Sequence, residues 1–183
     1  MPSPEPLAIE YRNHARIDRL VAVLRYTLEQ LSLEFDRWEE SRVYGPGMYL
    51  AVVVGPSVSS YADPMGANRW PDRGGVEPLA DWEGFLEAAI EVAYGCDGAV
   101  VISVDGVVSP QLVRFRMDAI DTELGYEPWM GARHMSALDV STREDVIATV
   151  TLSEETGRVT VFEDGTFESE ERQNLGGAWR AEV

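Results

Sequence analysis

Apolar residues recur every three or four positions over residues 13–41. They are Ile17, Val21, Leu24, Leu28, Leu31, Phe35 and Trp38. This spacing predicts a long N-terminal amphipathic helix with one continuous apolar stripe. The stripe has to be buried, so we expect the helix to pack on the body of the domain, with a two-helix coiled coil as the alternative.

A short continuous apolar run follows at residues 48–54. A run of this kind, rich in β-branched residues, is typical of a strand that is covered on both faces. The next stretch, residues 55–78, contains repeated proline and glycine, and it is predicted to hold neither a helix nor a long strand. This stretch is interpreted either as a functional loop or as a disordered insertion.

A second amphipathic helix is predicted to begin after the N-cap residue Asp81, to run to Tyr94 and to stop at Gly95. Its expected inner face consists of Trp82, Phe85, Leu86, Ala89, Ile90 and Ala93. Helical character is also expected over residues 117–124 and 135–145.

The middle of the chain carries a hairpin signal, in which residues 99–104 and 107–109 flank Asp105-Gly106. An Asp-Gly pair suits a type I′ turn, because both central residues of that turn have positive φ. A second Asp-Gly pair occurs at residues 164–165.

A second pair of β-rich segments, residues 146–152 and 158–162, is joined by residues 153–157. Predicted helices and strands therefore alternate loosely, with hairpins among them. This order predicts an α/β (α+β) fold, a single domain on one mixed β-sheet flanked by helices.

The chain is predicted to divide into three parts. Residues 1–12 form a flexible lead-in, residues 13–165 form the single domain, and residues 166–183 form an acidic C-terminal tail that is expected to fray from Glu168 onward. The residues that could pack a last turn back onto the body are Leu175, Trp179 and Val183.

The charge of the chain is unusual, because 32 Asp and Glu face 15 basic residues, a net charge of −17, and all 15 are arginine. An acidic surface suits a protein in molar salt, where the Debye length is about 3 Å and self-repulsion is screened. A halophilic origin is therefore one explanation, and an acidic protein from an organism with arginine-rich codon usage is the other. Under either explanation, we do not expect the protein to bind nucleic acid through a basic patch.

Several other classes of protein are excluded in the same way. No apolar run approaches the roughly 20 residues that span a bilayer, so no membrane association is expected. The single cysteine, Cys96, allows no disulfide within the chain, and the first residues lack the features of a secretory signal, which predicts a cytoplasmic protein. Zinc-ligand spacing, a Walker lysine and a Rossmann glycine pattern are all missing from the sequence.

Three segments place polar residues beside glycines at the ends of predicted elements, namely residues 97–99, 131–136 and 153–157. In the first, Asp97 stands where a helix gives way to a buried strand, next to a glycine that would let a ligand approach the backbone. A plain turn aspartate explains Asp97 equally simply when it is taken alone.

The second segment sets Arg133 and His134 side by side at the expected start of a helix. Helix N-termini attract anions, and arginine binds phosphate through two parallel hydrogen bonds, so a phosphate site is one interpretation. A surface arginine beside a capping histidine is the other. The third segment, residues 153–157, is by itself typical of a solvated hairpin loop.

Taken in order, the three segments resemble the diadenylate cyclase domain family, over about residues 49–165. The carrying motifs are Asp97-Gly98-Ala99, then Gly131-Ala132-Arg133-His134, which is similar to the family's Gly-Thr-Arg-His-Arg, then Ser153-Glu154-Glu155-Thr156-Gly157. The resemblance implies a twisted mixed sheet surrounded by helices. It also implies condensation of two ATP into cyclic di-3′,5′-adenylate with release of pyrophosphate, the use of Mn²⁺ or Mg²⁺, and catalysis between two facing copies. With the acidic surface, it points to a haloarchaeal member.

The resemblance also implies roles for single residues. Asp97, Arg133 and His134 would be catalytic, and Asp97 would help to activate the ribose 3′-hydroxyl. The nucleotide would lie against Gly98, Ala99, Gly131, Ala132, Ser136, Ser153 and Glu154. The metal would be held by Asp97, His134 and Glu155.

Two positions depart from the family pattern, since Ala132 replaces its Thr and Met135 replaces its second Arg. One hydroxyl and one positive charge are therefore missing. The loss at Met135 matters little if that side chain points away from the nucleotide. The alternatives to a cyclase are a non-catalytic adenine-nucleotide-binding or regulatory relative on the same fold, and a structural partner of a complete cyclase.

Overall fold

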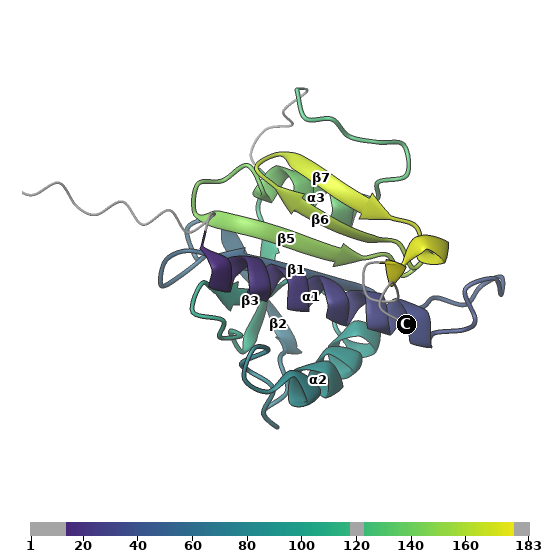
Figure 1. The fold of residues 1–183 in the computed structure, drawn as a ribbon. Helices are drawn as coiled ribbons and strands as arrows, with labels where there is room; N and C mark the ends of the chain where they lie inside the picture. The colour runs from purple at the N-terminus through teal and green to yellow at the C-terminus, as the bar shows by residue number, and fades with distance from the viewer. Residues whose placement is uncertain (1–13, 118–122, 178–183) are drawn as a thin grey trace, which may run out of the picture.

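The computed structural model describes residues 14–117 and 123–177, and all structural statements refer to them. Strands β3, β1, β5, β6 and β7 form a five-stranded sheet in that order, and β2 and β4 form a two-stranded sheet (Figure 1). The strands are β1 (Met48–Val53), β2 (Ala62–Arg69), β3 (Val100–Ser103), β4 (Gln111–Phe115), β5 (Val146–Leu152), β6 (Val159–Glu163) and β7 (Thr166–Glu170). The helices are α1 (Ala15–Glu34), α2 (Trp82–Gly95), α3 (Ala132–Val140) and the short 3₁₀ helix η2 (Arg172–Asn174). The predicted mixed α+β single domain is thereby confirmed.

Strand β1 lies inside the larger sheet and is buried along its whole length, as its continuous apolar run predicts. It runs parallel to β3 and antiparallel to β5, so that Leu50 pairs with both Val100 and Val150. Strands β5, β6 and β7 continue as an antiparallel meander. Both hydrogen-bonding edges of β1 are therefore satisfied within the sheet.

The side chains of β1 alternate between two cores, one on each face of the sheet. Leu50 and Val52 join the core beneath α1 and α2, whereas Tyr49, Ala51 and Val53 join the core beneath α3. Figure 1 shows α1 crossing the front of the sheet and α3 behind it. This alternation follows from the two-residue repeat of a strand, and it allows one short strand to anchor both layers.

The N-terminal helix is shorter than its apolar spacing predicts, because α1 ends at Glu34. The next residue, Phe35, is extended, and the indole of Trp38 turns back to donate a hydrogen bond to the Ser32 carbonyl at 2.9 Å. The rings of Phe35 and Trp38 meet edge to face at 4.8 Å. Their helical spacing thus reflects a local folded-back contact, while the helix itself packs on β5 and β6 as expected.

The prediction that residues 55–78 contain no long strand is wrong, because β2 lies within them and pairs antiparallel with β4. The pairing is interrupted between Pro64 and Arg69, and Gly66 has a φ of +59°. Because most of β2 is exposed, the missing ladder bonds around proline and glycine are satisfied at little cost by solvent. Because this exposed strand tolerates proline and glycine, its amino-acid composition does not indicate a strand.

The two Asp-Gly pairs form different turns. At Asp105-Gly106 only the glycine has positive φ, so the expected type I′ turn is wrong there. At Asp164-Gly165 both residues have positive φ, +50° and +73°, and this turn joins β6 to β7.

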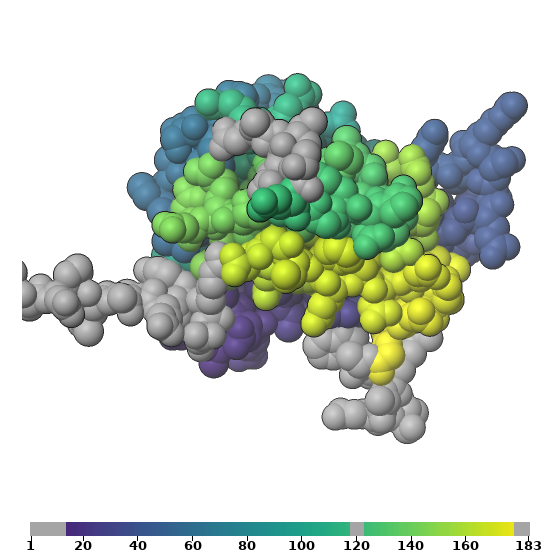
Figure 2. Space-filling model, turned by 90° about the horizontal axis from the view of Figure 1, so that it is seen from above, coloured from purple at the N-terminus to yellow at the C-terminus, as the bar shows by residue number. Residues whose placement is uncertain are grey.

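Strand β7 occupies the start of the segment that was expected to be a frayed tail. It pairs with β6 through Glu170, so the expectation of fraying from Glu168 is wrong. Leu175, just beyond η2, is buried, as expected if the last turn packs back onto the body of the domain. In Figure 2 these last described residues form the yellow band along one face of the molecule.

Helix α2 begins after Asp81 as predicted, although Ile90 is exposed rather than turned inward. Helix α3 spans Ala132–Val140, so the expected helix at 135–145 is placed too late along the chain. The expected helix at 117–124 lies mostly outside the described residues. Among the residues that the structure describes, no helix combines the length and the apolar character needed to cross a membrane.

Candidate functional site

Two of the three predicted segments meet in one pocket of about 360 Å³. Its walls come from β1, β2, β4, the turn before β3 and the first turns of α3. They are formed by Tyr49, Met65, Asp97, Gly98, Ala99, Val113, Arg114, Phe115, Met117, Ala132, Arg133 and Ser136. A larger cavity, about 530 Å³, lies at the other end of β1 and β3 and is lined by none of the predicted residues. We call the first cavity the Asp97 pocket.

Asp97 is held at the mouth of this pocket by its backbone. Its N–H donates to the Asn68 side-chain carbonyl at 2.8 Å, and its carboxylate is exposed. Two residues later, Ala99 exchanges backbone hydrogen bonds of 2.7 and 3.0 Å with Val113. The carboxylate therefore projects from a rigid backbone, and none of the described residues donates a hydrogen bond to it.

Gly98 is required by space as well as by backbone conformation. Its φ is +100°, in the region that glycine adopts without strain. A Cβ there would lie 2.9 Å from Cγ of Met65 and 3.0 Å from the Val113 carbonyl oxygen. The motif glycine thus allows β2 and β4 to close against the segment that carries Asp97.

The N-terminus of α3 opens into the same pocket. Its N-cap is Gly131, which offers no side-chain hydrogen bond, and its first turn holds no acidic residue. The first helical hydrogen bond is donated by Met135 to the Gly131 carbonyl. The N–H groups of Ala132, Arg133 and His134 therefore have no partner among the described residues, and they form a natural anion site.

Arg133 is anchored weakly on the pocket wall. One guanidinium nitrogen is 3.4 Å from the Leu152 carbonyl oxygen, and another is 4.0 Å from a carboxylate oxygen of Glu154. A Cβ at Gly47 would lie 2.6 Å from the guanidinium and 2.9 Å from Cβ of Glu154, so that glycine lets β1 approach the pair. Glu154 thus lies beside Arg133, although it does not line the pocket.

The rest of the third segment is not brought to the pocket. The hydroxyl of Ser153 accepts from the backbone N–H groups of Glu155 and Thr156, at 3.4 and 3.3 Å, and so shapes its own hairpin loop. Glu155 is exposed in that loop. Neither Ser153 nor Glu155 lines the Asp97 pocket.

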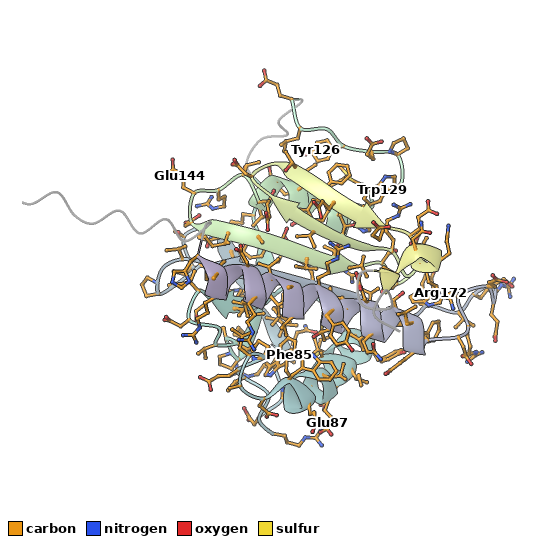
Figure 3. The ribbon with its side chains drawn as sticks, in the orientation of Figure 1. Phe85, Glu87, Tyr126, Trp129, Glu144 and Arg172 are labelled. Atoms are coloured by element: carbon orange, nitrogen blue, oxygen red, sulfur yellow. The ribbon has the colours of Figure 1, made fainter. Side chains whose placement is uncertain are left out.

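His134 does not line the pocket, although the family resemblance implies a catalytic and a metal-binding role for it. Its side chain is buried among aromatic rings, with centroids 5.1 Å from Trp129 and 6.5 Å from Phe162. Trp129 also meets the ring of Phe167 from β7, and Figure 3 shows it beside that strand. Burial, together with the positive charges of Arg133 and Arg158, lowers the pKa of His134 to about 4. It is therefore a neutral core residue at neutral pH.

The expected metal ligands are also not assembled. Within residues 14–117 and 123–177, no three His, Cys, Asp or Glu side chains are arranged to hold a metal ion. Asp97 reaches the pocket, His134 is in the core and Glu155 is in the hairpin loop. Any ion at this site would depend on Asp97 and on oxygens from a ligand.

Two polar residues of the pocket wall, Tyr49 and Arg114, were missed by sequence reasoning. The hydroxyls of Tyr49 and Ser136 lie 3.4 Å apart, and burial raises the pKa of Tyr49. Arg114 lines the pocket from β4. Both belong to elements distant in sequence from the motifs, and only the short alternation around Arg114 could have suggested a strand there.

Comparisons with known proteins concern the fold and the part of the chain that carries the motifs. The family described as "DAC: DisA bacterial checkpoint controller nucleotide-binding" matches residues 84–167, a stretch that contains all three motif segments. No curated protein matches the chain. This part of the chain is thus similar to a nucleotide-binding family.

Solved structures with the same fold include a double cysteine mutant of DacA from Staphylococcus aureus, with a TM-score of 0.53 and 18% identity over 90% of this chain and 97% of that chain. Another is described as a hypothetical membrane spanning protein from Bacillus cereus, with a TM-score of 0.55 and 17% identity over 81% of this chain. The match covers 62% of the Bacillus chain. These likenesses show that the chain shares the fold of DacA.

Proposed function

We propose that the protein is a diadenylate cyclase, a nucleotidyltransferase that converts two ATP into cyclic di-3′,5′-adenylate and two pyrophosphates. The observation that carries the proposal is the Asp97 pocket. It joins the exposed carboxylate of Asp97 to the uncapped N-terminus of α3, and both lie in the stretch that matches a nucleotide-binding family.

The pocket offers separate surfaces for the two ends of ATP. The open N–H groups of α3 and the guanidinium of Arg133 suit the triphosphate. Apolar side chains of Met65, Val113 and Phe115 suit the adenine ring, and the volume of about 360 Å³ is within the usual range for small-ligand sites. One chain thus has room for one nucleotide.

Ring closure requires two such chains to face each other. The 3′-oxygen of each ribose attacks the α-phosphorus of the other ATP and forms a new P–O bond. The bond from the α-phosphorus to the oxygen bridging to the β-phosphate breaks, and pyrophosphate leaves with its electron pair. Asp97, the one carboxylate among the described residues of the pocket wall, would take the proton of the hydroxyl. Arg133 and the α3 N–H groups stabilise the charge that develops on the phosphates.

A divalent cation such as Mg²⁺ or Mn²⁺ would fit this donor set through one carboxylate together with oxygens of the ligand and water. Magnesium in nucleotide sites is usually held by one or two carboxylates together with phosphate oxygens and water. The carboxylate of Asp97, which is exposed and accepts no hydrogen bond from any described residue, is the group that would hold it. When bound, such an ion supplies positive charge next to the reacting phosphate.

A second candidate is a non-catalytic adenine-nucleotide-binding relative on the same fold. Two observations favour it: Ala132 offers no hydroxyl at the start of α3, and His134 is buried away from the pocket. Such a protein would keep the phosphate site and lose the chemistry.

The two candidates are separated by incubating the purified protein with ATP and Mn²⁺ or Mg²⁺, from dilute buffer to molar KCl, and measuring cyclic dinucleotide by mass spectrometry. We expect product, with higher yield in concentrated salt because screening relieves the repulsion within a chain of net charge −17. Asp97→Asn should abolish product and keep ATP binding. Asp105→Asn, in an exposed turn outside the pocket, should behave as wild type. ATP binding without product at every salt concentration would establish the second candidate instead.

A further inference from the structure

Two arginines from different elements line the Asp97 pocket, Arg133 from α3 and Arg114 from β4. Arg114 directly follows Val113, whose backbone forms both hydrogen bonds of the bridge to Ala99. The bridge therefore fixes the backbone of Arg114 beside the segment that carries Asp97.

The guanidinium of Arg114 makes no hydrogen bond or ion pair with any described residue, and the side chain is exposed. The next arginine along the chain, Arg116, differs. It contacts the Asp63 carboxylate at 3.2 Å and donates to the Ser59 carbonyl at 2.9 Å. In a chain with 32 acidic residues, Arg114 keeps all five of its donors available at the pocket wall.

The local charge of the pocket wall is opposite to that of the protein. Two arginines and one aspartate line the pocket, a formal charge of +1, whereas the whole chain carries −17. Met135, the position at which a second positive charge is missing, packs partly buried against the α3-side core and does not line the pocket. The missing charge is thus at a position that this structure does not direct toward a ligand.

We propose that Arg114 is a second phosphate-binding residue, which holds the triphosphate of ATP from β4 while Arg133 and the start of α3 hold it from the other element. This inference rests on the proposed function and adds a residue that the motifs do not contain. Because each arginine can form charge-assisted hydrogen bonds to phosphate oxygens, the pair favours ligands with more phosphates over AMP.

The test measures the affinities of ATP and AMP for the wild type, Arg114→Gln, Arg133→Gln and Arg116→Gln, in the full-length protein by isothermal titration calorimetry. Arg116→Gln is the matched control, because it removes the same charge two residues away and outside the pocket. We expect Arg114→Gln to weaken ATP binding about tenfold, the effect of losing one charge-assisted hydrogen bond, and to change AMP binding much less. Arg114→Lys should recover part of the loss.

Each other outcome has a distinct meaning. ATP affinity in Arg114→Gln equal to that of Arg116→Gln, with Arg133→Gln impaired, would overturn the role of Arg114 and leave the proposed function standing. Equal losses for ATP and AMP would also overturn it, because Arg114 would then not act on the outer phosphates. A wild type that binds no ATP would overturn the proposed function and this inference together. A thermal unfolding midpoint of Arg114→Gln within the range of the Arg116→Gln control shows that the comparison is made between folded proteins.

Discussion

Helices α2 and α3 begin in opposite ways, although each adjoins a motif segment in the chain. Helix α2 is closed by its own side chain, since Asp81 accepts the Gly84 N–H at 3.0 Å and Glu83 adds an acidic group in the first turn. Helix α3 begins at a glycine, has no capping side chain and has Arg133 in its first turn.

This difference in capping indicates a different role for each helix N-terminus. A capped terminus has its donors satisfied and its dipole complemented within the protein. The start of α3 forgoes that stabilisation, and its free donors face a pocket wall with positive charge. Helix α2 is therefore a structural support, whereas α3 is suited to an external anion.

The most direct way to remove this difference is to give α3 the cap that α2 has, with Gly131→Asp. Gly131 is in an extended conformation and nothing lies within 4 Å of the position that a Cβ would take, so an aspartate fits there. We expect ATP binding to weaken about a hundredfold, because the carboxylate takes donors from the ligand and repels phosphate. Stability should stay the same or rise by about a few tenths of a kcal/mol. Gly131→Asn, a neutral cap, should have a smaller effect in the same titration, and unchanged ATP affinity in both variants would show that α3 does not bind the phosphates.

Met135→Arg tests the opposite side of the same helix turn. Because Met135 packs against the core beneath α3, an arginine there should lower the free energy of unfolding by about 2 kcal/mol and leave cyclase activity per folded molecule no higher. Urea unfolding and the product assay measure the two effects. A large gain in turnover would mean that residue 135 reaches the nucleotide.

His134 makes the start of α3 sensitive to acid. Its pKa in the folded protein, about 4, lies below the ordinary value of 6.5, so the unfolded state binds the proton more readily. The stabilising contribution is complete above about pH 6.5 and is lost as the pH falls toward 4. We expect a loss of about 1.5 kcal/mol between about pH 7 and about pH 5 in urea unfolding.

His134→Gln should reduce that pH dependence. His14→Gln should keep it, because His14 is the exposed N-cap of α1. An equal slope in wild type and His134→Gln would contradict the neutral, buried histidine.

Asp81→Ala is expected to have the smallest effect and to confine it to stability. Loss of the cap should destabilise the protein by about 1 kcal/mol, seen as a lower urea midpoint, with ATP affinity unchanged. A variant that loses ATP binding would show that the two helix starts are not independent.

The sequence was sufficient to predict those helices and strands whose signal lies within a short stretch of the chain. The cap and apolar face of α2, the buried run of β1 and the hairpin of β5 and β6 are each encoded within a few neighbouring residues. Strand β2 was missed because its partner is β4, far along the chain, and most of its side chains are exposed. Strand β7 was missed for a related reason, since its acidic residues resemble a tail until pairing with β6 is known.

The residues of the site also divide into those that local motifs identify and those that only the tertiary structure brings in. The motif order located Asp97, Ala132, Arg133 and Ser136, which do line one pocket. Motif order cannot tell which face of a short helix meets a cavity, and the structure places His134 in the core and not among the residues that line the pocket. Tyr49 and Arg114 enter the site through strand pairing alone, so their part in it depends on tertiary structure.

The position of β1 also sets when the pocket can exist during synthesis. Leu50 pairs with Val100 and with Val150, so the strand waits for partners that emerge fifty and one hundred residues after it. Helix α3 contacts β1 and β5, and it has no complete surface to pack on until β5 has left the ribosome. A nascent chain that already carries Asp97 and Arg133 therefore has no formed Asp97 pocket, and such late, non-local closure is expected to make folding slow compared with a helical bundle of this size.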